Sequence, residues 1–346
     1  MKKKLLWGTV GQGTRTLNRL AFPTQKDDGT VIRFDTSMGT DNLGDYIIMY
    51  YCGKVLDEMF PAHASVNIGT HLMPTEEQEH TVKQTKYKFV CGTNLLTSRI
   101  EHHWRWILPD GVRRKMNYRN VILMGVGWGE YQHGCSDYSR MIYRTMLNPC
   151  VLHAVRDQYT LNKLNQAGFR NVINTGCPTT WALTPEFCGG IPVEKAKDVV
   201  TTITDYRRDP EQDSEMLAIL SRNYDHIYLW LQGRNDEEYL QTLNVPANLT
   251  TIPASLEAYE EALQKGGVDY VGTRLHAGIH ALNYKIRSII LAVDNRATEM
   301  GRDVNLPVIQ RSEISRKLEK KINSDFLTEI RINQENIDRF KAQFRR

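Results

Sequence analysis

Short apolar runs alternate with amphipathic segments along most of this 346-residue chain, and this alternation restricts the possible fold more than any other feature. Runs of strand length lie at 121–124, 198–203, 227–231, 268–271 and 288–293. Helical spacing of apolar residues predicts helices from Leu43 to Phe60, Asp157 to Gly168, Ser214 to Asn223 and Ser255 to Gly266. Apolar strands that alternate with such helices form parallel sheets. We therefore predict an α/β fold.

The length of the chain suggests two domains of ordinary size. Composition changes between Thr184 and Lys197, where Pro185, Gly189, Gly190 and Pro192 precede a new strand. We take this segment as an interdomain linker and predict two Rossmann-like domains, residues 1–188 and 189–346. Ligands of such folds bind outside the carboxyl ends of the strands, which places the site in a cleft between the domains.

Composition excludes several classes of protein. A formal charge of +4 gives no reason to expect nucleic acid as a partner. Six scattered cysteines without a C-x-x-C pair predict reduced thiols of a cytoplasmic protein rather than a zinc or redox site. No apolar run approaches the roughly 18 residues of a membrane span. The stretch from Ile314 to Arg346 is basic, and two interpretations of it stay open. It fits a helix on an anionic membrane surface or a segment packed on its own domain.

The turn from strand to helix between Val268 and Ala281 suggests an anion site. Gly272 and Thr273 form the turn, and a helix opens near Arg274 to His276, where unpaired backbone N–H groups favour negative charge. An arginine can bind phosphate or carboxylate, and a histidine can transfer a proton near neutral pH. The alternatives are an arginine paired with a structural acid and a histidine in the core. No metal site is predicted, because His276 and His280 lack the glutamate of H-E-x-x-H.

Other motifs fit a ligand cleft or ordinary structure equally well. Asn42, Gly44 and Asp45 precede a long helix, as a ligand site or as a helix cap would. Gly127 lies in a glycine-rich turn that lets the backbone approach a ligand or simply turns tightly. Arg207 ends a strand and can reach a cleft or solvent, and the Arg156–Asp157 pair reads as an ion pair or cap. Trp104, Trp106, Trp128 and Trp181 suit sugar stacking, although burial is the commoner fate of tryptophan.

In their order along the chain, these motifs resemble the polysaccharide pyruvyltransferase family. The matching segments are Asn42-Leu43-Gly44-Asp45, Val121 to Gly129, Arg156-Asp157, Arg274-Leu275-His276 and Ser288 to Asn295. The resemblance covers roughly residues 35–296. Two segments depart from it: the glycine turn reads G-V-G-W-G instead of three consecutive glycines, and Gly176-Cys177-Pro178-Thr179 stands where Asp-Pro is common.

The resemblance implies a two-domain fold similar to GT-B glycosyltransferases, with the sugar acceptor on the N-terminal side and the donor on the C-terminal side. It implies transfer from phosphoenolpyruvate to two hydroxyls of a surface-polysaccharide precursor, giving a pyruvate ketal without a cofactor. Within it, His276 is the expected general acid and Asp45 a weaker candidate base. The expected substrate-binding residues are Arg274, Leu275, Arg207, Asn42, Gly44 and Gly127.

Three alternatives remain open on the sequence alone. The acceptor is either free or linked to a lipid, and in the second case the basic tail would hold the enzyme at the inner membrane face. A nucleotide-sugar glycosyltransferase would use a similar fold, with Glu299 as its only evident candidate for binding a ribose. A non-catalytic carbohydrate-binding protein on the same scaffold would not depend on His276.

Overall fold

The first half of the chain forms a parallel sheet covered by helices. The computed structural model describes residues 25–102, 106–111 and 115–345. Its first sheet has the strand order β2-β1-β3-β4, and a two-stranded sheet of β5 and β6 continues it through a parallel bridge between Val126 and Val155. The strands are β1 (Thr30–Asp35), β2 (Ala64–Gly69), β3 (Tyr87–Cys91), β4 (Val121–Met124), β5 (His153–Val155) and β6 (Val172–Asn174). The helices are α2 (Leu43–Met59), α3 (Glu76–Gln84), α5 (Asp137–Met146) and α6 (Gln158–Gln166).

The second half contains a six-stranded parallel sheet with the order β12-β11-β10-β7-β8-β9. Its strands are β7 (Asp198–Thr201), β8 (Ile227–Trp230), β9 (Leu249–Ile252), β10 (Val268–Gly272), β11 (Ser288–Ala292) and β12 (Val308–Gln310). The helices that follow the first half are α7 (Pro185–Cys188), α8 (Pro210–Asn223), α9 (Asp236–Leu240), α10 (Leu256–Gln264), α11 (Leu275–Asn283), α12 (Asn295–Val304), α13 (Glu319–Ile322) and α14 (Gln334–Ala342).

Read from β9, this order is the six-stranded order of a Rossmann sheet, and the order of the first sheet is that of the flavodoxin-like variant. The α/β fold with two Rossmann-like units is therefore confirmed, in the arrangement expected of a GT-B-like protein. The strand order reverses between β1 and β3 in one sheet and between β7 and β10 in the other. Ligands bind beside such reversals, so the loops after these four strands are where a site is expected.

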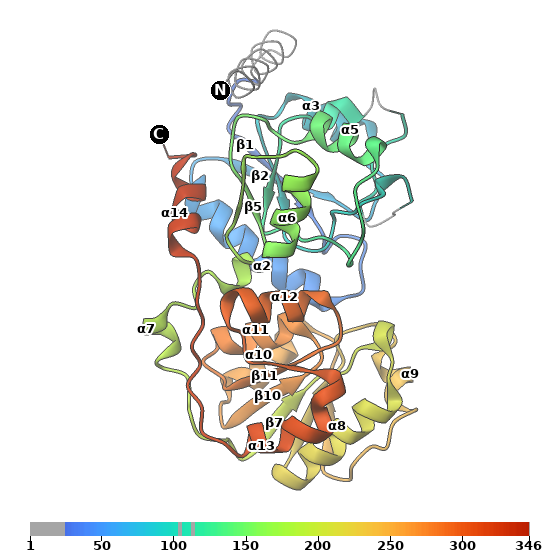
Figure 1. The fold of residues 1–346 in the computed structure, drawn as a ribbon, viewed down its shortest axis with the longest axis vertical. Coiled ribbons are helices and arrows are strands. Elements are labelled where there is room, and N and C mark those ends of the chain that lie inside the picture. The colour runs from blue at the N-terminus through green and yellow to red at the C-terminus, as the bar shows by residue number, and fades with distance from the viewer. Residues whose placement is uncertain (1–24, 103–105, 112–114, 346) are drawn as a thin grey trace, which may run out of the picture.

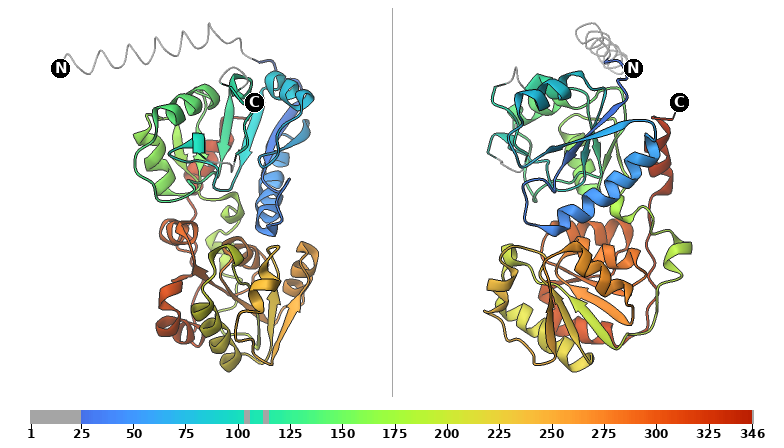
Figure 2. Two further views of the ribbon diagram at one scale, coloured as in Figure 1. Left: turned by 90° about the vertical axis from the view of Figure 1, so that its right-hand side faces the viewer. Right: turned by 180° about the vertical axis from the view of Figure 1, so that it is seen from behind.

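Helix α2 lies between the two halves, which are stacked one above the other (Figure 1; Figure 2). Its Ile47 belongs to the apolar core of the second half, whereas Ile48 and Cys52 belong to that of the first. Because α2 is shared between two cores, its N-terminus, which carries the Asn42-to-Asp45 motif, is fixed against both halves.

Three of the four predicted helices begin at the expected caps. Asn42, Asp157 and Ser255 each accept a hydrogen bond from a backbone N–H of the first turn of α2, α6 and α10. The predicted start of α8 at Ser214 is wrong. Asp209 caps this helix and Pro210 occupies its first turn, where the fixed φ of proline suits a helix.

The basic tail returns to the first half. Ile314, Leu318 and Ile322 are buried in the second half, but Ile337 and Phe340 of α14 belong to a core of the first. The assignment of the whole tail to the second domain is thus wrong for α14, whose apolar face completes the core beside β3. These five apolar residues of the tail are therefore buried in the protein's own cores, whereas Leu327 is 69% exposed, and contact with a membrane stays a prediction. In the part of the chain that the structure describes, no helix is long and apolar enough to cross a bilayer.

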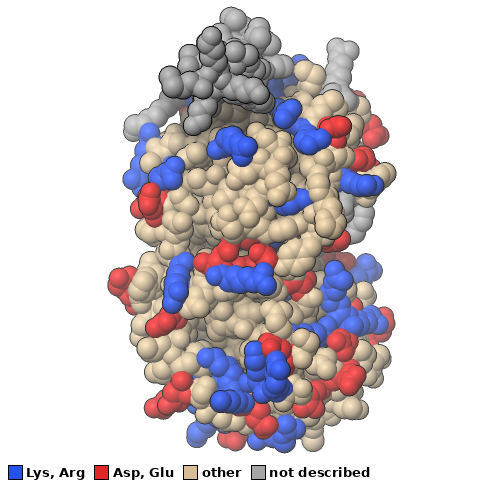
Figure 3. Space-filling model, in the orientation of Figure 1, with Lys and Arg blue, Asp and Glu red and all other residues tan. Residues whose placement is uncertain are grey.

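Charged side chains of both signs are interspersed over the face shown in Figure 3, including the boundary between the two halves. No single extended area of one sign covers this face. Its appearance agrees with the small net charge of the sequence.

Candidate active site

The N-terminus of α2 brings together three of the predicted site residues. Asn42 accepts a hydrogen bond from Gly44 N (3.2 Å) and donates through Nδ2 to Asp45 Oδ2 (3.3 Å). Gln232, in the loop after β8, donates to Asn42 Oδ1 from the other half at 2.8 Å. A Cβ on Gly44 would lie 2.9 Å from Gln232 Nε2, so a larger residue there would displace the Gln232 side chain that joins the halves.

The Asp45 carboxyl is only 8% exposed. Burial raises its pKa to about 6, against the positive charge of Arg296 and hydrogen bonds from Asn42, Thr40 and Thr93. A carboxyl with a pKa near neutral is suited to general base catalysis. The general-base role of Asp45 stays a prediction, with which this raised pKa is compatible.

His276 lies in the first turn of α11, and its Nε2 is 3.8 Å from the Sγ of Cys177. Burial, followed by the charges of Arg296 and Arg156, holds the pKa of His276 well below its usual value. Burial also raises the pKa of Cys177. In the free protein both groups are therefore neutral at pH 7.

The structure contradicts the predicted role of Arg274. Its side chain is 2% exposed, and Nη2 donates to Asp205 Oδ1 (2.8 Å) and Asp236 Oδ1 (2.6 Å). Its Nε donates to the carbonyl of Ile203 at 2.8 Å. Because two carboxylates already neutralise and enclose this guanidinium, it is not available to bind a donor anion. Pairing with structural acids was the alternative that the sequence left open.

The Arg274 ion pairs support the loop after β8. Asp236 accepts hydrogen bonds from the backbone N–H groups of Gln232 (2.9 Å) and Gly233 (2.7 Å) through its other carboxylate oxygen. Arg274 thereby fixes the loop whose Gln232 reaches Asn42 and, through it, Asp45.

Leu275 and Arg207 are not placed as substrate-binding side chains. Leu275 packs in the apolar core of the second half, which leaves only its backbone N–H at the start of α11 for a ligand. Arg207 is exposed at the surface, and its carbonyl accepts a hydrogen bond from Arg311. Both ring nitrogens of His280 have partners in the protein: Nδ1 lies 3.0 Å from the hydroxyl of Tyr51, and Nε2 lies 3.1 Å from Oε1 of Glu260.

Arg156, for which the sequence predicted an ion pair or a helix cap, places a buried positive charge at the candidate site. It is fully buried after β5, pairs with Asp157 (3.3 Å), and donates from Nη2 to Asn94 Oδ1 at 2.5 Å. Within the described residues its Nη1 has no hydrogen-bond partner. A buried guanidinium N–H without a partner is costly and therefore a candidate ligand contact.

The absence of a side chain at Gly127 leaves room for the guanidinium of Arg156. A Cβ on Gly127 would lie 2.2 Å from Arg156 Nη2 and 2.8 Å from Asn94 Oδ1. The sequence predicted that a ligand or the backbone would come close to Gly127. In the structure the Arg156 side chain occupies this space, which a larger residue at position 127 would fill.

Arg296, at the start of α12, is the central residue that the sequence analysis missed. Its guanidinium donates to both carboxylate oxygens of Asp294, and its charge lowers the pKa of both Asp45 and His276. Burial alone would raise the pKa of Asp294, but Arg296 outweighs it and holds the value at about 2. The only sequence signal was its place after an apolar strand at the carboxyl edge of the second sheet.

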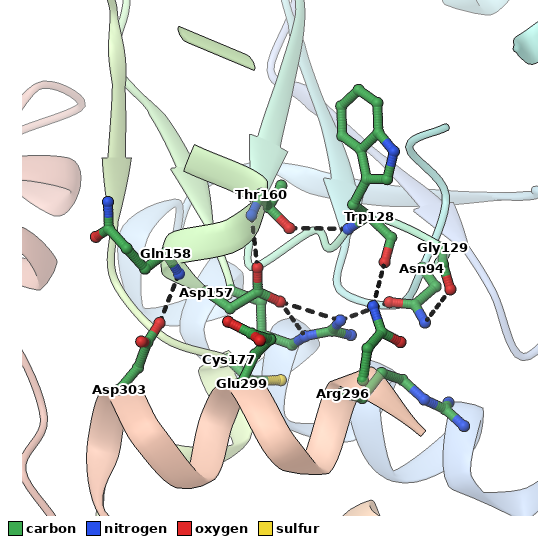
Figure 4. A network of polar contacts seen from close by, with 12 residues as sticks. Asn94, Trp128, Gly129, Asp157, Gln158, Thr160, Cys177, Arg296, Glu299 and Asp303 are labelled. Carbon is green, nitrogen blue, oxygen red and sulfur yellow. Dashed lines mark hydrogen bonds and ion pairs between the residues drawn. The ribbon is translucent and has the colours of Figure 1, made fainter. Parts of the chain in front are cut away.

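Helix α12 fixes the two halves against each other. Asn295 donates to the carbonyl of Trp128 (3.4 Å), Glu299 accepts from Tyr131 (2.6 Å), and Asp303 accepts from the N–H of Gln158 (2.5 Å). Figure 4 shows α12 below the loops of the first half, with the Glu299 side chain toward them and Arg296 at the start of the helix. Glu299 serves this contact, which leaves the glycosyltransferase alternative without its candidate acid. Trp106, Trp128 and Trp181 are buried, and Trp104 lies outside the described residues.

The two α/β halves thus bring a neutral histidine, a raised-pKa carboxyl and two arginines into one candidate active site. The sequence matches the polysaccharide pyruvyl transferase family over residues 42–295, and the chain belongs to that family. The match contains every residue of the candidate site except Arg296, which follows it directly.

Comparison with solved structures gives more distant similarities. An S. aureus MnaA–UDP complex aligns with a TM-score of 0.47 and 10% identity, over 87% of this chain and 91% of the other. The E. coli heptosyltransferase WaaC with ADP aligns with a TM-score of 0.32 and 12% identity, over 76% and 86% of the two chains. No curated protein matches the sequence significantly.

Proposed function

We propose that this pyruvyltransferase transfers the enolpyruvyl group of phosphoenolpyruvate to two hydroxyls of one sugar in a polysaccharide precursor, forming a pyruvate ketal. One observation carries the proposal: His276, Asp45, Arg156 and Arg296 come from both halves and share one electrostatic environment. The six cysteines are free thiols, in keeping with the cytoplasmic location that we propose. A lipid carrier for the acceptor stays a prediction.

The donor carries a phosphate and a carboxylate, and two groups of the site suit these anions. Arg156 offers an N–H without a partner among the described residues, and Arg296 adds a second positive charge that acts on both His276 and Asp45. The first backbone N–H groups of α11 also favour a negative charge at the N-terminus of this helix. An anion bound here would offset the arginine charges that depress the pKa of His276.

Protonation of the donor would begin the reaction. His276, protonated once the anion is bound, gives its proton to the methylene carbon of phosphoenolpyruvate, and positive charge develops on the neighbouring carbon. One sugar hydroxyl attacks that carbon while Asp45 accepts its proton. The second hydroxyl then displaces phosphate, which leaves with the remaining proton. General acid and base catalysis of this kind contributes about 10²–10⁴-fold per group.

Thermal unfolding with ligands tests the donor assignment. A ligand at about 100 times its Kd adds roughly 2.7 kcal/mol to the native state, which is visible as a rise in Tm. We expect phosphoenolpyruvate to raise Tm, Arg156→Gln to abolish the rise, and the exposed Arg207→Gln control to retain it. A rise only with nucleotide sugars would reject the donor and favour a glycosyltransferase.

A further inference from the structure

A pocket lies beside the α2 N-terminus and is lined by residues of both halves. It encloses about 320 Å³, within the range of roughly 300–1,000 Å³ that is typical of ligand pockets. Thr40, Asp41 and Tyr46 line it from the first half, and Gln232, Arg234 and Glu237 from the second. The loops after β1 and β8 form its walls, so it opens at the carboxyl edges of both sheets.

The lining is that of a site for a neutral polyhydroxylated ligand. Two carboxylates and one guanidinium give the pocket a small negative charge, which disfavours phosphate or diphosphate. Carboxylates accept hydrogen bonds and a guanidinium donates them, and sugar hydroxyls can do both. Gln232, only 3% exposed, adds a carbonyl oxygen without a partner among the described residues. An unsatisfied buried acceptor is a favourable partner for a hydroxyl.

Two exposed aromatic rings lie on α2: Tyr46 lines the pocket, and Tyr50 lies beyond it on the same helix. Tyr46 is 43% and Tyr50 53% exposed, and they lie one helical turn apart on the same face. Exposed tyrosine rings offer flat apolar surfaces with a polar edge, as the C–H faces of sugar rings require. The buried tryptophans of this chain do not offer such a surface.

Two residues that line the pocket are hydrogen-bonded, directly or through Asn42, to the candidate base Asp45. Thr40, which lines the pocket, donates to Asp45 Oδ2 at 3.4 Å, and Gln232 reaches the same carboxylate through Asn42. Asp45 is not among the residues that line the pocket, and its other carboxylate oxygen accepts a hydrogen bond from Thr93 of the first half at 3.5 Å. A sugar in the pocket is therefore adjacent to the reacting sugar rather than identical with it.

We propose, on the basis of the function proposed above, that this pocket binds a non-reacting sugar unit of the acceptor, with Tyr46 and Tyr50 as its stacking surface. The acceptor is then held by both halves, and oligosaccharides bind more tightly than single sugars.

A glycan array carrying bacterial surface oligosaccharides, from mono- to hexasaccharides, tests this proposal with the full-length protein. We expect binding that increases with length, a loss of roughly tenfold in Tyr46→Ala, and a smaller loss in Arg234→Ala. Tyr138→Ala, another partly exposed tyrosine on the distant helix α5, is the matched control and retains binding.

Two outcomes would overturn the proposal: no glycan bound, or binding that Tyr46→Ala leaves unchanged. The stabilisation by phosphoenolpyruvate is measured on the same variants. If Tyr46→Ala keeps that stabilisation but loses glycan binding, the pocket acts separately from the donor site. If the wild-type protein binds glycans but not phosphoenolpyruvate, the donor assignment fails while the sugar site stands.

Discussion

Replacing Gly127 by alanine tests whether Arg156 is the anion-binding residue. The new Cβ would lie 2.2 Å from Arg156 Nη2 and 2.4 Å from Cζ, far inside the normal contact distance. Removing that overlap requires the guanidinium to move by roughly 1 Å. Because Arg156 is fully buried, it cannot move without losing its hydrogen bond to Asn94.

The magnitude follows from these contacts. Hydrogen bonds to a charged group contribute about 1.5–3 kcal/mol each, and overpacking costs about 1–3 kcal/mol. A displaced Arg156 should therefore weaken the binding of phosphoenolpyruvate by about 10–150-fold, since about 1.4 kcal/mol corresponds to tenfold in Kd. The free energy of unfolding should fall by a comparable amount, which leaves the protein folded at 25 °C.

Titration calorimetry with phosphoenolpyruvate measures the affinity, and circular dichroism verifies the fold. Gly189→Ala is the matched control, because its Cβ would meet no atom closer than 3.5 Å, an ordinary contact. Affinity equal to that of the wild type in a folded Gly127→Ala protein would refute the role of Arg156.

Three further substitutions probe the same site. Asp45 has a folded pKa of about 6 against an ordinary 3.8, so its burial costs stability that grows as pH rises through this range and is fully present above it. Asp45→Asn should abolish turnover yet stabilise the protein by about 2–3 kcal/mol at pH 7, and denaturant unfolding should show this gain vanishing near pH 4. Arg274→Ala leaves Asp236 buried without its partner and should cost about 3–5 kcal/mol in the same assay; unchanged stability with lost donor binding would restore Arg274 as a ligand. Cys177→Asp places a carboxyl beside His276 and should raise the pKa of that imidazole, observed by NMR titration; a pKa that stays low would show that the two side chains do not interact.

The sequence predicted most of the architecture because its signals are local. Helix starts at Asn42, Asp157 and Ser255 depend on a side chain and the N–H groups two or three residues away. Five strands, β4, β7, β8, β10 and β11, were visible as apolar runs for the same reason, whereas the other described strands lie outside the predicted runs. The start of α8 was misplaced because Asp209 and Asp213 both suit a cap, and the structure uses Asp213 to pair with Arg311 instead.

The site was harder to predict because its partners are distant along the chain. Arg274 is neutralised by Asp236 and Asp205, which lie 38 and 69 residues away, so no local pattern showed that it was occupied. Arg296 influences Asp45 only because α12 lies against the first half. Likewise, the return of α14 to the first half depends on a gap beside β3 that the tail sequence does not reveal.

Direct detection of pyruvyl transfer tests the central claim. The enzyme is incubated with phosphoenolpyruvate labelled with ¹³C at the methylene carbon and with saccharide precursors extracted from bacterial cells, and NMR follows the label. We expect phosphate release that depends on the saccharide, with the label appearing as the methyl group of an acid-labile ketal, and neither in Asp45→Asn. Phosphate release with the label ending in free pyruvate, or label transfer from a nucleotide sugar instead, would contradict the account.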